Sequence, residues 1–156
     1  MTTTQTSTLK HLAIAGITGE LAFEAYAWAL SPALFGPSLQ PANLVVGLTK
    51  AATGLTLPYG AAFAIHALIG SLGFAAVVWL VRRVGGLGHV VAGALAGLIL
   101  WFVAQGLLAP LMGRSFMMGF GAYTQSSFIG HVGMTLIIGL VWKWLDTRHP
   151  TAAHPA

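Results

Sequence analysis

The chain of 156 residues contains no cysteine. Disulfide bonds, thiolate metal sites and cysteine nucleophiles are therefore excluded. Charged residues are nearly as scarce, because seven lysines and arginines and three acidic residues make up 6% of the chain. A soluble domain usually carries about 25% charged residues. The scarcity of charge therefore argues against a soluble domain.

Long apolar runs dominate the sequence instead. Four of them cover about residues 12–35, 59–80, 90–112 and 128–145. Each is close to the ~20 residues that a helix needs to cross a hydrocarbon core about 30 Å thick. We therefore predict an all-α fold, in which residues 1–156 form a single integral membrane domain built as a four-helix transmembrane bundle.

The basic residues stand at the ends of the predicted helices rather than in one patch, so no nucleic-acid partner is expected. Most of them fall at the two termini or in the second loop: Lys10, Arg82, Arg83, Lys143 and Arg148. Because loops rich in Lys and Arg stay in the cytoplasm, this distribution predicts that both the N-terminus and the C-terminus are cytoplasmic.

Two pairs of segments suggest that the halves of the chain are related. ALSPALFGPSL (29–39) resembles LLAPLMGRSF (107–116), and FAIHALIG (63–70) resembles SFIGHVGM (127–134). One interpretation is a tandem repeat of a helical hairpin, of the parallel kind that some transporters use. The other is that apolar helices rich in glycine and alanine simply look alike.

The second half also carries a family resemblance. LAPLMGRSFMMG, followed by SFIGHVGMTLIIGLVWKWL, resembles the YagU-like family of small bacterial inner-membrane proteins. The similarity lies in a turn with proline, methionine and glycine after one helix, and in a Gly-His pair at the opening of the last. It implies a multi-pass protein of the bacterial inner (cytoplasmic) membrane, and it brings no function with it.

Both glutamates of the chain, Glu20 and Glu24, lie inside the first apolar run. Because they are four residues apart, they share one face of a helix. Carboxylates within a membrane are expensive, and they almost always face the bundle interior and find a partner. The glutamates therefore predict a buried polar site on the first helix.

Few other polar side chains lie inside the predicted helices, and the notable ones are His66, Gln105, His131 and Thr135. With a rise of ~1.5 Å per residue, Glu24, His66, Gln105 and His131 fall within one layer, and Glu20 lies about a turn deeper. Gly93 and Gly97 form a pair of small residues that lets membrane helices approach closely. We therefore expect the polar residues to converge on one bundle axis.

The first functional interpretation of this layer is a cofactor or metal site. His66 and His131 could ligate the iron of a haem b from two helices. Alternatively, Glu20, Glu24, His66 and His131 could hold a transition metal ion, with Gln105 and Thr135 as polar residues behind the ligands. The Glu-x-x-His motif of carboxylate bundles is absent, which favours a haem or a single metal ion over a dinuclear centre.

Two alternatives remain open. Chains of Glu and His are the usual proton relays inside membranes, so the protein could form a proton or cation pathway or part of a transporter, which would need an oligomer. It could also be a non-catalytic accessory subunit of a larger membrane complex, docking through Phe116-Met117-Met118. The expected partners are therefore the lipid bilayer and either further copies of the chain or a larger complex. No nucleophile elbow or P-loop is present, so a stand-alone enzyme is not favoured and no catalytic residue is assigned.

Overall fold

The computed structural model describes residues 3–148, which form helices and no strand. These residues make five continuous helices. Three of the five are composite, since a π-helical segment interrupts each: α1 (Thr3–Ala25), η1 (Tyr26–Leu30) and α2 (Ser31–Phe35); α4 (Tyr59–Leu68), η2 (Ile69–Gly73) and α5 (Phe74–Gly85); and α6 (His89–Phe102), η3 (Val103–Leu108) and α7 (Ala109–Leu111). The other two are the short α3 (Ala42–Thr53) and the long α8 (Ala122–Arg148).

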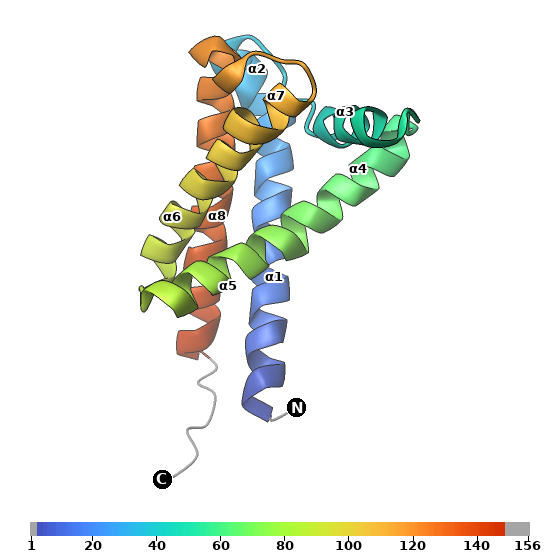
Figure 1. The fold of residues 1–156 in the computed structure, drawn as a ribbon. Coiled ribbons are helices and arrows are strands. Elements are labelled where there is room, and N and C mark those ends of the chain that lie inside the picture. The colour runs from blue at the N-terminus through green and yellow to red at the C-terminus, as the bar shows by residue number, and fades with distance from the viewer. Residues whose placement is uncertain (1–2, 149–156) are drawn as a thin grey trace.

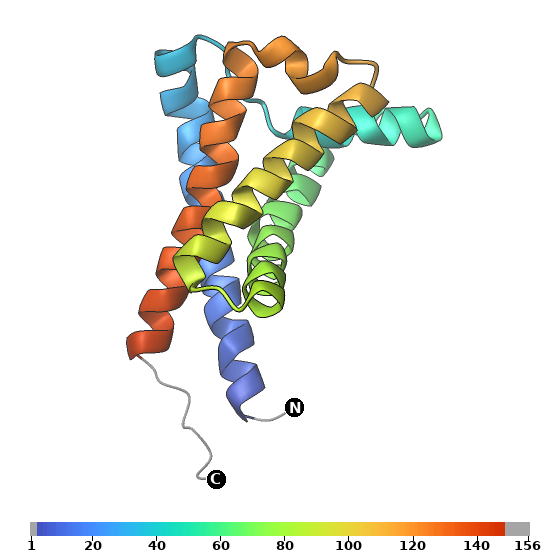
Figure 2. The same cartoon turned by 60° about the vertical axis from the view of Figure 1, so that its left-hand side comes forward.

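The long helices run up and down between two ends of the molecule (Figures 1 and 2). The beginning of α1 and the end of α8 lie at one end, which we call the terminal end. The short helix α3 lies across the opposite end, which we call the α3 end, and packs against α4 and α7. α8 packs along both α1 and α6, whereas α4 leans away from α7 toward the α3 end. The fold therefore opens toward the α3 end.

Three of the helices are long and apolar enough to cross a membrane: Tyr59–Gly85, His89–Leu111 and Ala122–Arg148. The helix that contains both glutamates, α1 with its continuation to Phe35, is not among the three found in the described residues. Carboxylates lower the mean hydropathy of any segment that contains them, which explains why this helix is less apolar than the other three. The prediction of an all-helical membrane protein is confirmed, and the prediction of four spans stays a prediction.

The helices extend beyond the apolar runs that predicted them. The last helix begins at Ala122 rather than near residue 128, and the second ends at Gly85 rather than near residue 80. Hydropathy marks the part of a helix that lies in hydrocarbon, and a helix continues past it until its backbone is interrupted. Gly86 provides such an interruption after α5, because its left-handed φ of 61° ends the helix as a C-terminal cap. Residues 43–52, which lie between the first two apolar runs, are also helical and form most of α3.

Small residues allow a close helix contact between α6 and α8. A Cβ atom at Gly93 would overlap the carbonyl oxygen of Thr135, and one at Gly97 would overlap the Thr135 hydroxyl. Ala92 and Ala96 on the same helix are fully buried. Helices in membranes associate through such close backbone approach, so the predicted role of the glycine pair is confirmed.

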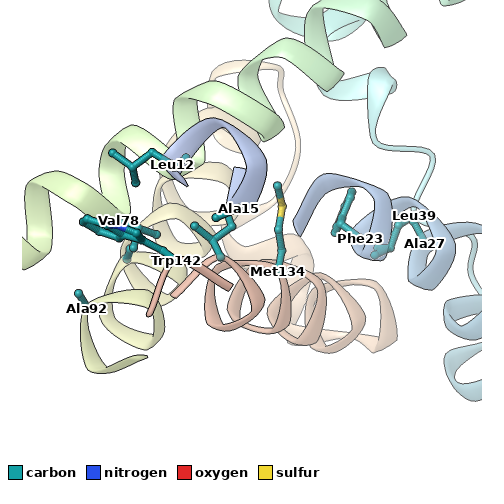
Figure 3. Close-up of a cluster of buried hydrophobic side chains, with 12 residues drawn as sticks. Leu12, Ala15, Phe23, Ala27, Leu39, Val78, Ala92, Met134 and Trp142 are labelled. Carbon is teal, nitrogen blue, oxygen red and sulfur yellow. The ribbon is translucent and has the colours of Figure 1, made fainter. Parts of the chain in front are cut away.

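A cluster of buried apolar side chains links α1, α5, α6 and α8 (Figure 3). Trp142 and Val78 both belong to it, and each is at most 1% exposed. Met134 and Phe23 continue the cluster along α1 and α8 toward the α3 end. The apolar cluster therefore holds α1 firmly against α8, and this contact fixes the height and rotation of the two glutamates on α1.

Two of the π-helical segments come directly before a proline. η1 precedes Ser31-Pro32, and η3 precedes Ala109-Pro110. Proline lacks a backbone N–H and crowds the carbonyl four residues earlier, and a widened turn relieves both problems. The two segments thus share a local geometry at matching places in 29–39 and 107–116, although the tandem repeat itself stays a prediction.

Candidate metal centre

Glu20 and Glu24 of α1 meet His66 of α4 in the interior of the protein. Nδ1 of His66 lies 3.3 Å from Oε1 of Glu20 and 3.6 Å from Oε1 of Glu24. One ligand atom from each of the three residues can be chosen so that all lie within 4.8 Å of one another. The spacing of four residues along α1 places both carboxylates on the face that the composite helix α4–η2–α5 crosses, with η2 packed against α1. We call these three residues the Glu/His cluster.

The polar atoms of the Glu/His cluster lack ordinary hydrogen bonds. Both carboxylate oxygens of Glu20, Oε1 of Glu24 and Nδ1 of His66 are buried without a hydrogen-bond partner among the described residues. Buried polar groups are nearly always paired, because an unpaired one loses its hydration without compensation. Four such atoms that face one another form a set of carboxylate and imidazole ligands, which suits a transition metal ion.

Two neighbours fix the geometry of the carboxylates. Trp28 donates its indole N–H to Oε2 of Glu24 over 2.7 Å, which leaves Oε1 turned toward His66. Gly70 of η2 lies so close to Glu20 that a Cβ atom there would overlap the carboxylate. A hydrogen bond of this kind orients a ligating carboxylate, as expected for a metal site. Sequence reasoning did not single out either Trp28 or Gly70 for this role.

His131 lies near the Glu/His cluster but outside it. Its Nδ1 donates to the carbonyl oxygen of Ser127 over 2.8 Å, so Nε2 of the neutral ring carries the lone pair. The ring of Phe23 lies against both histidines, with its centroid 5.8 Å from that of His66 and 6.3 Å from that of His131. The group of close ligand atoms found in the described residues therefore contains three of the four predicted metal ligands, and His131 is not in it.

The two predicted supporting residues have different positions. Gln105 of η3 is 7% exposed, donates to the Ser127 hydroxyl over 3.2 Å and leaves its own Oε1 unpaired within the described residues. It thus joins the polar wall that contains His131. Thr135 instead donates to the His131 carbonyl within α8 and packs against Gly97. Its role is helix packing, and it does not lie among the residues around the Glu/His cluster.

An apolar cavity of about 230 Å³ leads to the Glu/His cluster. Glu20, His66, Gln105 and His131 all line it, so these four residues share one space. The rest of its lining is mostly apolar and comes from α3, η2, α6, η3 and α8. A pocket with apolar walls and a few convergent polar groups is the usual form of a ligand site.

A second polar cluster lies at the terminal end, and sequence reasoning missed it. Asp146, the only aspartate of the chain, accepts a hydrogen bond from Nδ1 of His11 over 2.7 Å and one from Nε2 of His89 over 3.0 Å. The three residues come from α1, α6 and α8. The edge of the His89 ring also contacts Trp142, with the ring centroids 4.6 Å apart. The signal available in the sequence was that each of the three residues stands near a helix end.

Comparisons with known proteins give no match for this chain. No protein-family model matches the sequence, and neither a curated protein nor a solved structure matches it. The resemblance to the YagU-like family therefore stays a prediction.

Proposed function

We propose that this protein is an integral membrane protein that binds one divalent transition-metal ion through Glu20, Glu24 and His66. The observation that carries the proposal is the convergence of three ligand atoms within 4.8 Å, most of them buried and unpaired. Two carboxylate oxygens and one imidazole nitrogen would bind the metal ion without a large rearrangement of the helices.

Charge balance supports a divalent cation. Two ionised carboxylates beside a neutral His66 leave two negative charges inside a membrane without a counter-charge, and the free energy of desolvating them is large. A divalent cation bound by both carboxylates and by a neutral imidazole forms a complex with no net charge. The metal ion would therefore offset most of the free energy needed to bury the charges of Glu20 and Glu24 inside the protein.

The ligand types narrow the choice of metal. Ca²⁺ and Mg²⁺ are held almost entirely by oxygen, and sites selective for Cu(I) use sulfur. A set of two carboxylates and one imidazole favours Zn²⁺, Mn²⁺, Fe²⁺ or Co²⁺. A haem between His66 and His131 is less favoured, because the ring of Phe23 packs against both imidazoles and His66 already faces two carboxylates.

Metal analysis of the purified protein, with cobalt as a spectroscopic probe, tests the proposal. The protein is reconstituted with Co²⁺, and the visible d–d bands and the metal content are measured together. We expect one equivalent of Co²⁺ in the wild type and a loss of at least half of it in Glu24→Gln and His66→Ala. An absorption spectrum recorded before reconstitution also tests for haem.

Asp146→Asn provides the matched control, because it removes a partly exposed carboxylate that accepts hydrogen bonds from two histidines at the terminal end, away from the Glu/His cluster. We expect this variant to bind Co²⁺ as the wild type does. Equal metal content in the wild type, Glu24→Gln and His66→Ala would refute the proposed ligands.

The proposed topology places four helices across the membrane. The first helix would be the fourth span, since its buried glutamates meet α4 in the same layer as the apolar helices, and both ends of the described chain lie at the terminal end (Figure 1). The distribution of Lys and Arg supports a cytoplasmic location for that end in a bacterial inner membrane. Cysteine-accessibility labelling at Leu9 and Leu55 from either side of the membrane tests this orientation.

A proton pathway is the second candidate, and the Asp146 cluster is the observation that favours it. The Glu/His cluster and the Asp146 cluster provide titratable groups at two levels along α1, the helix that contributes to both. Proton relays in membranes are built from such groups. Proteoliposomes with a pH gradient test this candidate, and equal proton flux through the wild type and Glu24→Gln would remove it.

A further inference from the structure

The cavity that leads to the Glu/His cluster extends from the middle of the protein to the α3 end. Its inner part is lined by Glu20, His66 and His131, and its outer part by residues of α3 and of the segment that follows α7. Figure 1 shows that α4 leans away from α7 in this region, with α3 lying across the top. The lining of the cavity therefore reaches from the Glu/His cluster to the α3 end, as a site for a chain-like molecule requires.

The walls of the cavity are apolar and in contact with the surroundings of the protein. They include six half-buried side chains: Leu44, Leu48, Phe74, Leu100, Val103 and Met112. Ile69, which also lines the cavity, is 49% exposed. In a bilayer such surfaces face acyl chains, so a hydrocarbon chain can enter the cavity without crossing water.

A single positive charge stands at the outer part of the cavity. Among the residues that line it, all of them described, Arg114 is the sole lysine or arginine. Arg114 follows α7 at the α3 end and is exposed, and no ion pair of its guanidinium is found within the described part of the chain. The inner part of the cavity is lined by the acidic Glu20 instead. An anionic group would therefore be placed at Arg114, with its apolar part directed inward.

We propose that the cavity binds an acyl chain that ends in an anionic group, with the anion at Arg114 and the chain directed toward His131 and the Glu/His cluster. Arginine is suited to this role, since its planar guanidinium binds carboxylates and phosphates with two hydrogen bonds. The proposal goes beyond the metal site and does not depend on it, because neither the charge of Arg114 nor the apolar walls require a bound metal.

Equilibrium binding of radiolabelled oleate to the protein in phosphatidylcholine nanodiscs tests the proposal, with empty nanodiscs as the blank and EDTA present to remove metal. We expect one saturable site for each protein chain. Arg114→Gln should weaken oleate binding by about tenfold or more, the loss expected for a charge-assisted hydrogen bond. Unlabelled methyl oleate, which has the same chain without the charge, should compete equally in the wild type and in Arg114→Gln.

Arg83→Gln is the matched control, because Arg83 is also exposed but lies beside Trp79 and does not line the cavity. We expect it to bind oleate as the wild type does. Val103→Trp should fill the cavity and abolish binding of both oleate and methyl oleate, and its thermal unfolding reports whether the variant folds. Absence of saturable binding, or equal oleate affinity in the wild type and Arg114→Gln, would overturn the proposal.

The source of the chain is resolved by adding phosphatidylglycerol to the nanodiscs. Competition with oleate would assign the site to an acyl chain of an anionic phospholipid. Undiminished oleate binding would assign it to a free fatty acid. Both results support an anionic acyl chain, and the metal content of the same samples is measured separately, so that failure of this proposal is distinguishable from failure of the metal site.

Discussion

The carboxylate of Glu20 occupies the space that a side chain at position 70 would need. Gly70 is buried in η2, and a Cβ atom built on it would overlap the Glu20 carboxyl group. The same carboxylate lies 3.3 Å from Nδ1 of His66, four residues before Gly70 on the same composite helix. One glycine thus allows a helix to supply a histidine and to make room for the acid that faces it.

Replacing Gly70 with alanine should therefore damage the metal site more than the fold. The methyl group would push the Glu20 side chain away from His66, because a side chain can rotate where a backbone cannot. We expect the affinity for Co²⁺ to fall by about tenfold or more, the usual effect of disturbing the residues that orient a ligand. Titration with Co²⁺, followed by its visible bands, measures this change.

Gly133→Ala is the control for Gly70→Ala. Gly133 lies in α8, and a Cβ atom there would meet nothing within 4 Å. Both variants make the same chemical change inside a helix. If the two variants bind Co²⁺ with the same affinity, the contact between Gly70 and Glu20 has no bearing on the metal site.

Glu20→Gln should affect stability in opposite directions with and without metal. Without metal, removing one of two neighbouring carboxylates relieves their repulsion and desolvation, so the variant should unfold at a temperature at least as high as the wild type. With metal at about 100 times its dissociation constant, the wild type should gain roughly 2.7 kcal/mol and the variant much less. Thermal unfolding in detergent, with EDTA or with Co²⁺, measures both effects. Equal shifts on adding Co²⁺ would contradict this prediction.

Much of the fold was accessible from the sequence, because hydropathy reports directly on the part of a helix that lies in lipid. The apolar runs located the helices, and the glycine pair Gly93 and Gly97 correctly indicated the contact with α8. The helix ends were predicted less well. The first turns of α8, from Ala122 onward, are polar enough to resemble a loop, although the backbone stays helical through them.

The candidate site was predicted in part, because depth follows from residue number but rotation about a helix axis depends on packing. Glu20, Glu24 and His66 converge as expected, since the spacing of the acids fixes their common face. His131 shares their cavity but turns toward Ser127, with Phe23 packed between the two histidines. Nothing in the sequence indicated that the ring of Phe23 would occupy this place.

Asp146→Asn should destabilise the contact among three helices at the terminal end. The carboxylate accepts hydrogen bonds from His11 of α1 and His89 of α6, and an amide offers only one acceptor oxygen in its place. One histidine therefore loses its acceptor, and we expect a loss of about 1 kcal/mol or more in the free energy of unfolding. Thermal unfolding in detergent measures this loss.

The neighbouring variant Thr147→Val is the control, since the exposed Thr147 hydroxyl donates to the carbonyl of Trp144 in its own helix and so links no two helices. We expect it to unfold close to the wild-type temperature. Identical unfolding of Asp146→Asn and Thr147→Val would mean that the Asp146 cluster does not hold the helices together.

Gly97→Ala should damage the fold more than the metal site, whereas Gly70→Ala should damage the metal site more than the fold. A Cβ atom at Gly97 would come within 2.7 Å of the Cα atom of Val132 and 3.0 Å of the His131 carbonyl oxygen. These are backbone atoms, so α6 and α8 would have to separate, and we expect a loss of about 1–3 kcal/mol in unfolding free energy. Gly97→Ala should therefore unfold at a lower temperature than Gly70→Ala, while Gly70→Ala should bind Co²⁺ more weakly. If Gly97→Ala instead unfolds like Gly133→Ala, close backbone packing does not set the contact between α6 and α8.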